Sequence, residues 1–221
     1  LIQLVLKTLF AMKTYLFACA TTLAFGAAVP ADAQFFPGKT LFGIQTFFYP
    51  TQAADLNVDG FPDLVATRNN DRRVVYWYWN DGQGHFPSEP SDSLDIGFDL
   101  FQVVIADLNG DGFPDFATWE YGPSDGPVIW YAGDGQGHFT EQAAQYDDGI
   151  PINDFFAADM DADGDQDLIL VEDAIFAVNL RWAANDGQGN FSNPQPIATL
   201  PTFASPIHIT DINGDGLSDV L

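Results

Sequence analysis

The stretch Ala106–Phe116 reads ADLNGDGFPDF, and oxygen-bearing side chains fall on alternate positions within it. Asp107, Asn109 and Asp111 are followed by a glycine, and a further carboxylate, Asp115, closes the run. Clustered carboxylates repel one another unless a cation or water compensates their charge. Carboxylate, amide and carbonyl oxygens suit a hard cation, and calcium tolerates irregular oxygen sites better than magnesium does. The pattern D-x-[DN]-x-D-G-x-x-D therefore predicts a calcium loop.

The same pattern occurs four times, in loops 55–63, 107–115, 159–167 and 211–219, whose first aspartates are each 52 residues apart. In every loop we expect ligands from the side chains at positions 1, 3, 5 and 9 and from the backbone carbonyl at position 7. The glycine at position 6 permits the sharp turn that brings them together. The predicted ligands are Asp55, Asn57, Asp59, Phe61 (backbone) and Asp63; Asp107, Asn109, Asp111, Phe113 (backbone) and Asp115; Asp159, Asp161, Asp163, Asp165 (backbone) and Asp167; and Asp211, Asn213, Asp215, Leu217 (backbone) and Asp219.

The third loop carries the most carboxylates, so we expect it to bind calcium at least as tightly as the others, unless Asp165 points outward. These loops are not EF-hands. An EF-hand requires a bidentate glutamate at position 12, whereas position 12 is Ala66, Thr118 and Leu170 in the first three loops.

A second motif recurs between the acidic loops: NDGQGHF from Asn80, GDGQGHF from Gly133 and NDGQGNF from Asn185. Asp-Gly supplies the positive φ that a tight hairpin needs, so we interpret these segments as hairpin turns. His85 and His138 lie beside two of the turns, but no alternating ligand set accompanies them. We therefore do not expect them to bind zinc.

Each 52-residue period contains four extended segments and no helical periodicity. One strand precedes each acidic loop and another follows it, beginning at position 9. Third strands are predicted at 74–79, 128–131 and 177–182, and fourth strands begin at Phe86, Phe139 and Phe191. Trp77, Trp130 and Trp182 recur at one register, which favours packing between sheets over sugar stacking.

Four short strands in about 50 residues, repeated, are typical of β-propeller blades. The fold class that we predict is therefore all-β, a β-propeller of four-stranded antiparallel blades. A stacked β-solenoid is the main rival, although its rungs are usually shorter.

Composition restricts the partners. The chain has 31 Asp and Glu against 7 Lys and Arg, a formal charge of -24, which argues against nucleic acid and anionic membranes. Hydrophobic residues make up 47% and aromatic residues 14%, which is enough for a packed core and argues against disorder.

The N-terminal region has the features of a secretory signal peptide at residues 12–33, with Lys13 before an apolar stretch and an A-x-A site before Gln34. Residues 1–11 are interpreted as a spurious upstream extension of the reading frame. The only cysteine, Cys19, lies inside the signal segment. We therefore expect a secreted chain without disulfides or a transmembrane anchor, which would need another means of stabilisation such as metal ions.

The predicted mature chain, residues 34–221, opens on an extra fourth strand near Phe36 and stops within a second strand at 219–221. In closed propellers an extra strand of this kind completes the last blade and so removes an exposed edge. We therefore expect a partial propeller, part of a longer protein.

DLNGDGxxDL followed by W-x-x-NDGxGxF resembles the FG-GAP / VCBS-type repeat of secreted, mostly bacterial proteins, over about residues 34–221. The resemblance implies a calcium-binding propeller, commonly seven-bladed, with the calcium loop between the first two strands of each blade, as in the integrin α-subunit. The phenylalanine-glycine pair itself is kept only at Phe42-Gly43, which places the chain nearer the VCBS side.

Two functions remain open on this basis. The first is a non-catalytic extracellular interaction or adhesion module that binds a protein or glycan. The second is the propeller or carbohydrate-binding portion of a longer extracellular enzyme, for example one that acts on polysaccharides. The sequence has no nucleophile elbow and no HExxH motif, and Glu120, Glu141 and Glu172 do not form a recognisable acid/base pair. A catalytic domain beyond residue 221 would distinguish the two.

Overall fold

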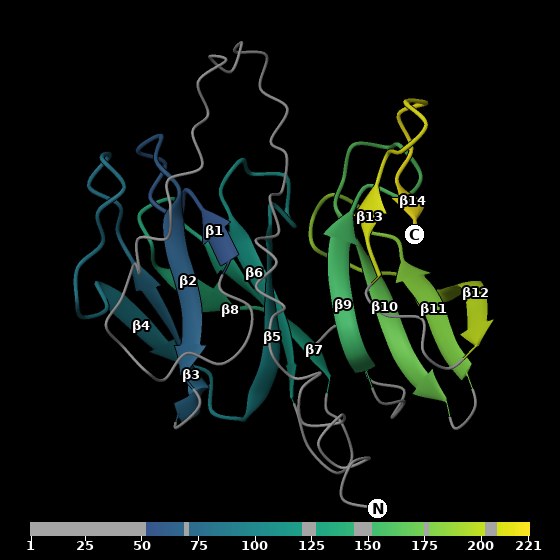
Figure 1. Ribbon diagram of the computed structural model, residues 1–221, viewed down its shortest axis with the longest axis horizontal. Coiled ribbons are helices and arrows are strands. Elements are labelled where there is room, and N and C mark those ends of the chain that lie inside the picture. The colour runs from purple at the N-terminus through teal and green to yellow at the C-terminus, as the bar shows by residue number, and fades with distance from the viewer. Residues whose placement is uncertain (1–51, 69–70, 121–126, 144–151, 175–176, 202–206) are drawn as a thin grey trace, which may run out of the picture. The chain divides into compact units, whose positions relative to one another are not determined.

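The computed structural model describes the predicted propeller region in six segments, residues 52–68, 71–120, 127–143, 152–174, 177–201 and 207–221. These residues form strands, turns and connecting loops, without a helix among them (Figure 1). No segment of this described part could therefore cross a membrane as an apolar helix. The predicted signal peptide, the extra strand near Phe36 and the Phe42-Gly43 pair lie outside the described residues.

The strands form three four-stranded antiparallel sheets and one two-stranded hairpin. The first sheet contains β1 (Gln52–Ala54), β2 (Asp63–Arg68), β3 (Asp71–Tyr78) and β4 (Asp92–Asp95). The second contains β5 (Leu100–Ala106), β6 (Asp115–Glu120), β7 (Val128–Gly133) and β8 (Phe139–Glu141). The third contains β9 (Ile152–Ala158), β10 (Asp167–Ala174), β11 (Ala177–Ala183) and β12 (Gln195–Pro201), and the hairpin pairs β13 (Ile209–Thr210) with β14 (Asp219–Val220).

Within each sheet the strands pair in chain order, so every sheet is a simple meander without crossovers. The repeated four-stranded antiparallel unit is that of a propeller blade, which confirms the predicted fold class and period. The β2, β3 and β6 to β11 strands also lie where the sequence places them, because their runs of β-branched and aromatic residues suit a half-buried pleated surface.

The acidic loops all occupy the same place in the sheets, between the first two strands of each repeat. The last residue before each loop pairs with the loop's ninth residue, as Ala54↔Asp63, Ala106↔Asp115, Ala158↔Asp167 and Thr210↔Asp219. Each loop is thus closed by the same ladder pair. The loops connect strands rather than helices, which agrees with the rejection of the EF-hand.

The predicted start of the fourth strand was wrong in two of the three sheets. In the second sheet β8 does begin at Phe139, but β4 begins at Asp92 instead of Phe86, and β12 at Gln195 instead of Phe191. Pro87 and Pro90 precede β4, and Pro194 precedes β12. Proline has no N–H to give to a strand ladder, so the pairing of β4 begins only after Pro90. In the third sheet Phe191 does form an isolated bridge to Asn185, but the continuous pairing with β11 begins only at Gln195.

The core lies between successive sheets. One cluster joins the first sheet to the second and contains Trp77, Phe116 and Tyr131. Its aromatic rings interlock: Phe116 stacks on Tyr131 at 4.6 Å, and Trp77 meets Phe139 edge-on at 5.3 Å. Burying an aromatic side chain of this size is worth roughly 1.5–3 kcal/mol.

A second cluster joins the second sheet to the third and includes Trp130 and Trp119, which meets Phe155 at right angles at 5.0 Å. Trp77 and Trp130 are buried at equivalent positions, which confirms their predicted role in packing between sheets, while Trp182 is half-buried. A third cluster packs Ile207 against residues of the third sheet.

Candidate metal-binding loops and the turns that hold them

All four acidic loops share one hydrogen bond that wraps their backbone around the first aspartate. The amide of the position-6 glycine donates to this carboxylate in every loop: Gly60 to Asp55 (2.8 Å), Gly112 to Asp107 (2.8 Å), Gly164 to Asp159 (3.1 Å) and Gly216 to Asp211 (2.9 Å). These glycines have φ between +87° and +99°, a conformation that side-chain-bearing residues rarely adopt. The invariant glycine of the pattern therefore has the turning role that the sequence predicts.

The aspartate at position 5 shapes the other half of each loop. Its carboxylate accepts from the amide at position 7, with distances of 2.9 Å for Phe61 to Asp59, 2.9 Å for Phe113 to Asp111, 3.0 Å for Asp165 to Asp163 and 2.9 Å for Leu217 to Asp215. This bond recurs in all four loops. The remaining oxygen of the first aspartate, in contrast, accepts from the amide at position 5 in the first loop, from the amide at position 4 in the second and fourth loops, and from no described residue in the third.

The aspartate at position 9 ties each acidic loop to the second motif. Asp63, Asp115 and Asp167 are each 0% exposed. One of their oxygens accepts from the amide at position 2, that is Leu56 (3.1 Å), Leu108 (2.8 Å) and Met160 (2.9 Å). The other oxygen accepts from the backbone amide of the first residue of the second motif, that is Asn80 (2.9 Å), Gly133 (2.8 Å) and Asn185 (2.8 Å). We call this motif, residues 80–86, 133–139 and 185–191, the DGQG turn.

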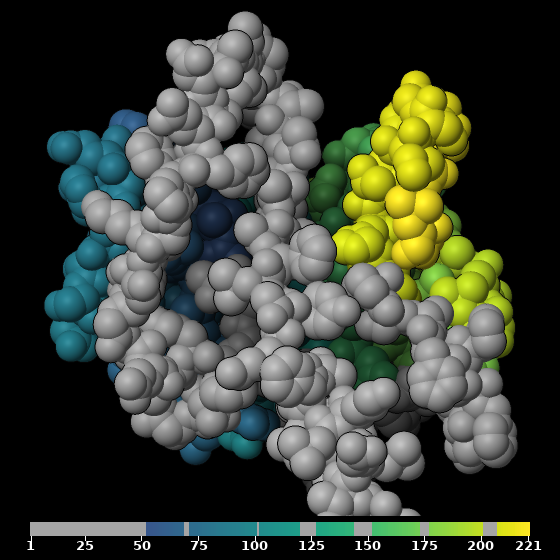
Figure 2. Space-filling model, in the orientation of Figure 1, coloured from purple at the N-terminus to yellow at the C-terminus, as the bar shows by residue number. Residues whose placement is uncertain are grey.

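This bond between loop and turn is not apparent from either motif alone. The only signal for it is the near-constant separation of 17 or 18 residues between the aspartate and its turn partner. In the fourth loop, Asp219 accepts from Ile212 over 3.1 Å. That loop is exposed throughout residues 211–217 (yellow in Figure 2).

The DGQG turns are hairpin turns, as predicted. In each turn the backbone amide of the aspartate donates to the backbone carbonyl four residues later, over 3.1–3.2 Å. The pairs are Asp81 with His85, Asp134 with His138, and Asp186 with Asn190. In the first two turns the aspartate carboxylate also meets the histidine Nδ1, at 2.9 Å and 2.8 Å. Each of the two imidazoles therefore forms a hydrogen bond within its own turn.

Electrostatics disfavour the ionised form of the buried position-9 carboxylates. Burial raises the pKa of Asp63 and Asp167, and it raises that of Asp115 to about 6 despite the hydrogen bonds from Gly133 and Leu108. Nearby aspartates of the same loops add to the effect by repulsion. A bound cation would favour the charged carboxylates instead.

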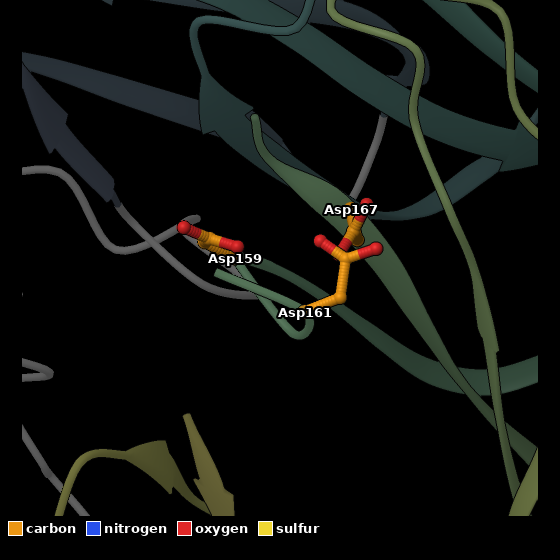
Figure 3. A group of neighbouring side chains, drawn as sticks. All are labelled: Asp159, Asp161 and Asp167. Carbon is orange, nitrogen blue, oxygen red and sulfur yellow. The ribbon is translucent and has the colours of Figure 1, made fainter. Parts of the chain in front are cut away.

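The third loop shows most directly that the residues fit a cation. Asp159, Asp161 and Asp167 each place one carboxylate oxygen within 4.8 Å of the others, and Figure 3 shows Asp161 reaching toward Asp167. Oδ1 of Asp159 is buried and accepts no hydrogen bond from any residue that the structure describes. A buried acceptor without a partner is costly, and a cation is one group that would satisfy it.

The first and second loops differ from the third at position 3. There, Asn57 and Asn109 donate their side-chain amides to the carboxylates of Asp59 and Asp111, over 3.0 Å in both loops. Asp161 has no N–H to donate, so it contributes a carboxylate instead. The amide oxygens of Asn57 and Asn109 accept from the backbone at position 5.

The side chain at position 7 packs over the DGQG turn. An added Cβ on Gly82 would come within 2.8 Å of the Phe61 ring, and one on Gly187 within 2.5 Å of the Asp165 carboxylate. Partial desolvation and the neighbouring aspartates raise the pKa of Asp165. The extra carboxylate of the third loop thus lies beside the turn, and at position 7 the backbone carbonyl remains the predicted ligand.

Meander sheets with an acidic loop between their first two strands define the chain as a protein built from propeller-type repeats. The family model described as FG-GAP-like repeat matches residues 55–118 and 159–221. The chain therefore belongs to the FG-GAP repeat family, and the resemblance noted from the motifs is confirmed.

The curated relatives include integrin α-subunits. Integrin alpha-7 of Homo sapiens is 34% identical over 135 residues, which cover 54% of this chain and 11% of the relative. Integrin alpha-7 of Rattus norvegicus is 37% identical over 106 residues (43% and 9%), and integrin alpha-6 of Gallus gallus is 33% identical over 132 residues (53% and 12%). The matched part thus spans about a tenth of these relatives.

A solved structure with a similar chain is that of an Agrocybe aegerita lectin, described for its specific recognition of non-reducing terminal N-acetylglucosamine. It has a TM-score of 0.48 and 24% sequence identity, with coverage of 66% of this chain and 37% of the lectin chain.

Proposed function

We propose that this chain is a calcium-binding, non-catalytic extracellular module for interaction or adhesion. FG-GAP repeats of the integrin α type are non-catalytic modules that suggest such a role. Calcium in the acidic loops would hold together a chain whose formal charge is -24.

The observation that carries the proposal is the partnerless, buried Oδ1 of Asp159 beside the carboxylates of Asp161 and Asp167. Asp163 and the backbone carbonyl of Asp165 complete the expected ligand set in this loop. The other three loops share the bond from the position-6 glycine to the first aspartate, although Oδ1 of that aspartate accepts a backbone amide there. Bound calcium would supply the positive charge that offsets repulsion among these carboxylates.

Thermal unfolding of the full chain tests the proposal. Calcium at one hundred times its dissociation constant stabilises the folded state by about 2.7 kcal/mol for each site. We therefore expect EDTA to lower the melting temperature by many degrees and excess calcium to restore it, with a smaller effect of equimolar magnesium. An identical melt in EDTA and in calcium would contradict a stabilising role for the ion.

The ligand assignment is tested separately by counting bound ions. Equilibrium dialysis followed by metal analysis should give about one calcium per intact loop. Asp163→Asn should lower the count by one or weaken one site, because it removes a carboxylate from the third loop. Thr199→Ala, a change on β12 outside every loop, should leave the count unchanged.

Secretion is a further part of the proposal. If residues 12–33 are a signal peptide, the exported protein begins at Gln34, and mass spectrometry of its N-terminal peptide will show this. Retention of the uncleaved segment in the exported protein would contradict the assignment. The partner on the extracellular side would be a protein or a glycan, whose binding should be lost when EDTA removes calcium.

A further inference from the structure

The second and third acidic loops are joined by one buried side chain, that of Asn185. Its Nδ2 donates to the carbonyl of Leu108 over 2.8 Å and to the carbonyl of Gln166 over 3.0 Å. Leu108 is position 2 of the second loop and Gln166 is position 8 of the third. Asn185 is 5% exposed. A single amide group therefore contacts the backbone of two candidate metal sites that belong to neighbouring sheets.

The connection continues into the predicted metal ligands. The backbone amide of Asn185 donates to Asp167 Oδ1 over 2.8 Å, and the amide of Leu108 donates to Asp115 Oδ2 over 2.8 Å. Hydrogen bonds thus run from Asp115 through Leu108 and Asn185 to Asp167 without passing through solvent, since all four residues are buried. In a low-dielectric interior such a network holds its members firmly relative to one another.

A close backbone contact supports the same junction. Gly110, at position 4 of the second loop, has φ +72°, and an added Cβ would lie 3.0 Å from the carbonyl oxygen of Gly187 in the third turn. The loop and the turn therefore approach each other so closely that a side chain at Gly110 would require the turn to shift by a few tenths of an ångström. In the first loop this position is held by Val58, whose side chain is 52% exposed.

The first and second loops lack the bridging side chain. The residue of the second turn that is equivalent to Asn185 is Gly133, which has no side chain that could reach the first loop. An added Cβ at Gly133 would collide with the carbonyl of Pro114. Asn80, at the same place in the first turn, donates to the carbonyl of Pro62 in its own loop over 2.9 Å.

We propose that Asn185 couples calcium binding at the second and third loops, so that filling one loop raises the affinity of the other. This rests on the proposed calcium binding. Ordering one loop fixes the shared hydrogen bonds and lowers the cost of ordering its neighbour, which is positive cooperativity without a change of fold. The first loop is not part of the coupled pair. Asn185 is thus a positioning residue for two sites.

Hydrogen–deuterium exchange of the full chain reports on each loop separately. Peptides spanning 107–116 and 159–168 are followed as free calcium is raised from zero in EDTA buffer. Asp163→Asn weakens the third loop at an exposed position that makes no bond to the network. We expect it to raise the calcium midpoint of the second loop on the order of fivefold. Asp59→Asn in the first loop should leave that midpoint unchanged.

Replacing the bridge should abolish this effect. Asn185→Gly copies the residue with which the second turn already forms, and Asn185→Asp keeps the oxygen that accepts from Gly187 and Gly189 but loses the donor. In either background, Asp163→Asn should no longer shift the midpoint of the second loop. Asn80→Gly, which removes the equivalent amide from the first turn, should leave the shift intact.

The outcomes separate the two proposals. If calcium protects both loops but Asp163→Asn leaves the second loop unaffected, or if its effect persists without the Asn185 amide, coupling is wrong and calcium binding stands. If calcium changes the exchange of no loop, both proposals are overturned.

Discussion

Asp115 and Gly133 are joined by a buried hydrogen bond in which the Gly133 amide donates to Asp115 Oδ1 over 2.8 Å. One residue closes an acidic loop and the other opens a DGQG turn. The equivalent bond joins Asp63 to Asn80 and Asp167 to Asn185. The two repeated motifs are therefore parts of a single unit, and this common bond accounts for their near-constant separation of 17 or 18 residues within each period.

Removal of this carboxylate should destabilise the fold even without metal. Asp115→Ala leaves the buried amides of Leu108 and Gly133 without an acceptor. Each unsatisfied group costs about 1–3 kcal/mol, so we expect a total loss of about 2–6 kcal/mol in the free energy of unfolding. Urea denaturation in EDTA measures it.

Asp111→Ala is the matched control, because Asp111 belongs to the same loop but is exposed. In EDTA it should cost less than about 1 kcal/mol. Equal losses for the two variants in EDTA would contradict a metal-independent contribution of the buried hydrogen bonds of Asp115.

The close approach of successive repeats predicts a second difference. Gly189 and Gly84 occupy the same turn position and have the same φ of +76°, but a Cβ would strike the Trp130 ring at Gly189 and would meet nothing within 4 Å at Gly84. Gly84→Ala should cost only the backbone strain of about 1–2 kcal/mol. Gly189→Ala should cost a further 1–3 kcal/mol or so from overpacking.

Thermal or urea unfolding of the two variants measures this difference, and near-UV circular dichroism should change only for Gly189→Ala, since only that change disturbs a buried tryptophan. Identical losses of stability would contradict tight packing of the third turn on Trp130.

Much of the fold could be predicted because the sequence repeats. A single acidic loop is ambiguous, but four first aspartates at a constant spacing, from Asp55 to Asp211, fix where each sheet begins. Most strand positions could be predicted from runs of apolar, β-branched and aromatic residues bounded by Asp-Gly turns. The start of β12 could not be predicted in this way, because it depends on where continuous pairing with β11 begins, and Phe191 forms only an isolated bridge to Asn185.

The candidate site was predictable in its ligands but not in its connections. The role of Asp115 in holding Gly133, and that of Asn185 in reaching Leu108, depend on contacts between segments 18 and 77 residues apart. No periodic pattern reveals the second of these, since the residue at the equivalent turn position is Gly133 in the neighbouring repeat. Asp165 likewise fits the loop pattern, and only the structure shows its side chain beside Gly187.

A buried ion pair in the third sheet offers a further test. Glu172 is 1% exposed and accepts from Arg181 over 2.8 Å. Arg181→Met removes the counter-charge of a buried carboxylate, which costs about 3–5 kcal/mol. Chemical denaturation at neutral pH measures the loss, and adding Glu172→Gln should recover part of it.

The exposed pair of Arg73 and Asp95, at 3.3 Å with side chains 51% and 60% exposed, provides the control. Arg73→Met should change the free energy of unfolding by less than about 1 kcal/mol, because water screens the pair. A similar loss in both variants would mean that burial of Glu172 adds nothing to the cost.

The second DGQG turn contains an imidazole whose titration is measurable in solution. His138 Nδ1 lies 2.8 Å from the Asp134 carboxylate. This hydrogen bond, with the charge of Asp134 and a smaller effect of Asp92, raises the pKa of His138 above its usual value of 6.5. The folded protein therefore holds this proton more tightly than the unfolded chain. The stabilisation is present below about pH 6.5 and is lost as the pH rises through the folded pKa.

Asp134→Asn should return the His138 pKa toward its usual value, because it removes both the charge and the strongest acceptor. An NMR titration of the imidazole Cε1 proton measures the shift. Asp186→Asn is the control, since the third turn has Asn190 in place of a histidine, and it should leave the His138 titration unchanged. A His138 pKa at or below 6.5 in the unsubstituted protein, or one that Asp134→Asn does not lower, would show that the pair does not persist in solution.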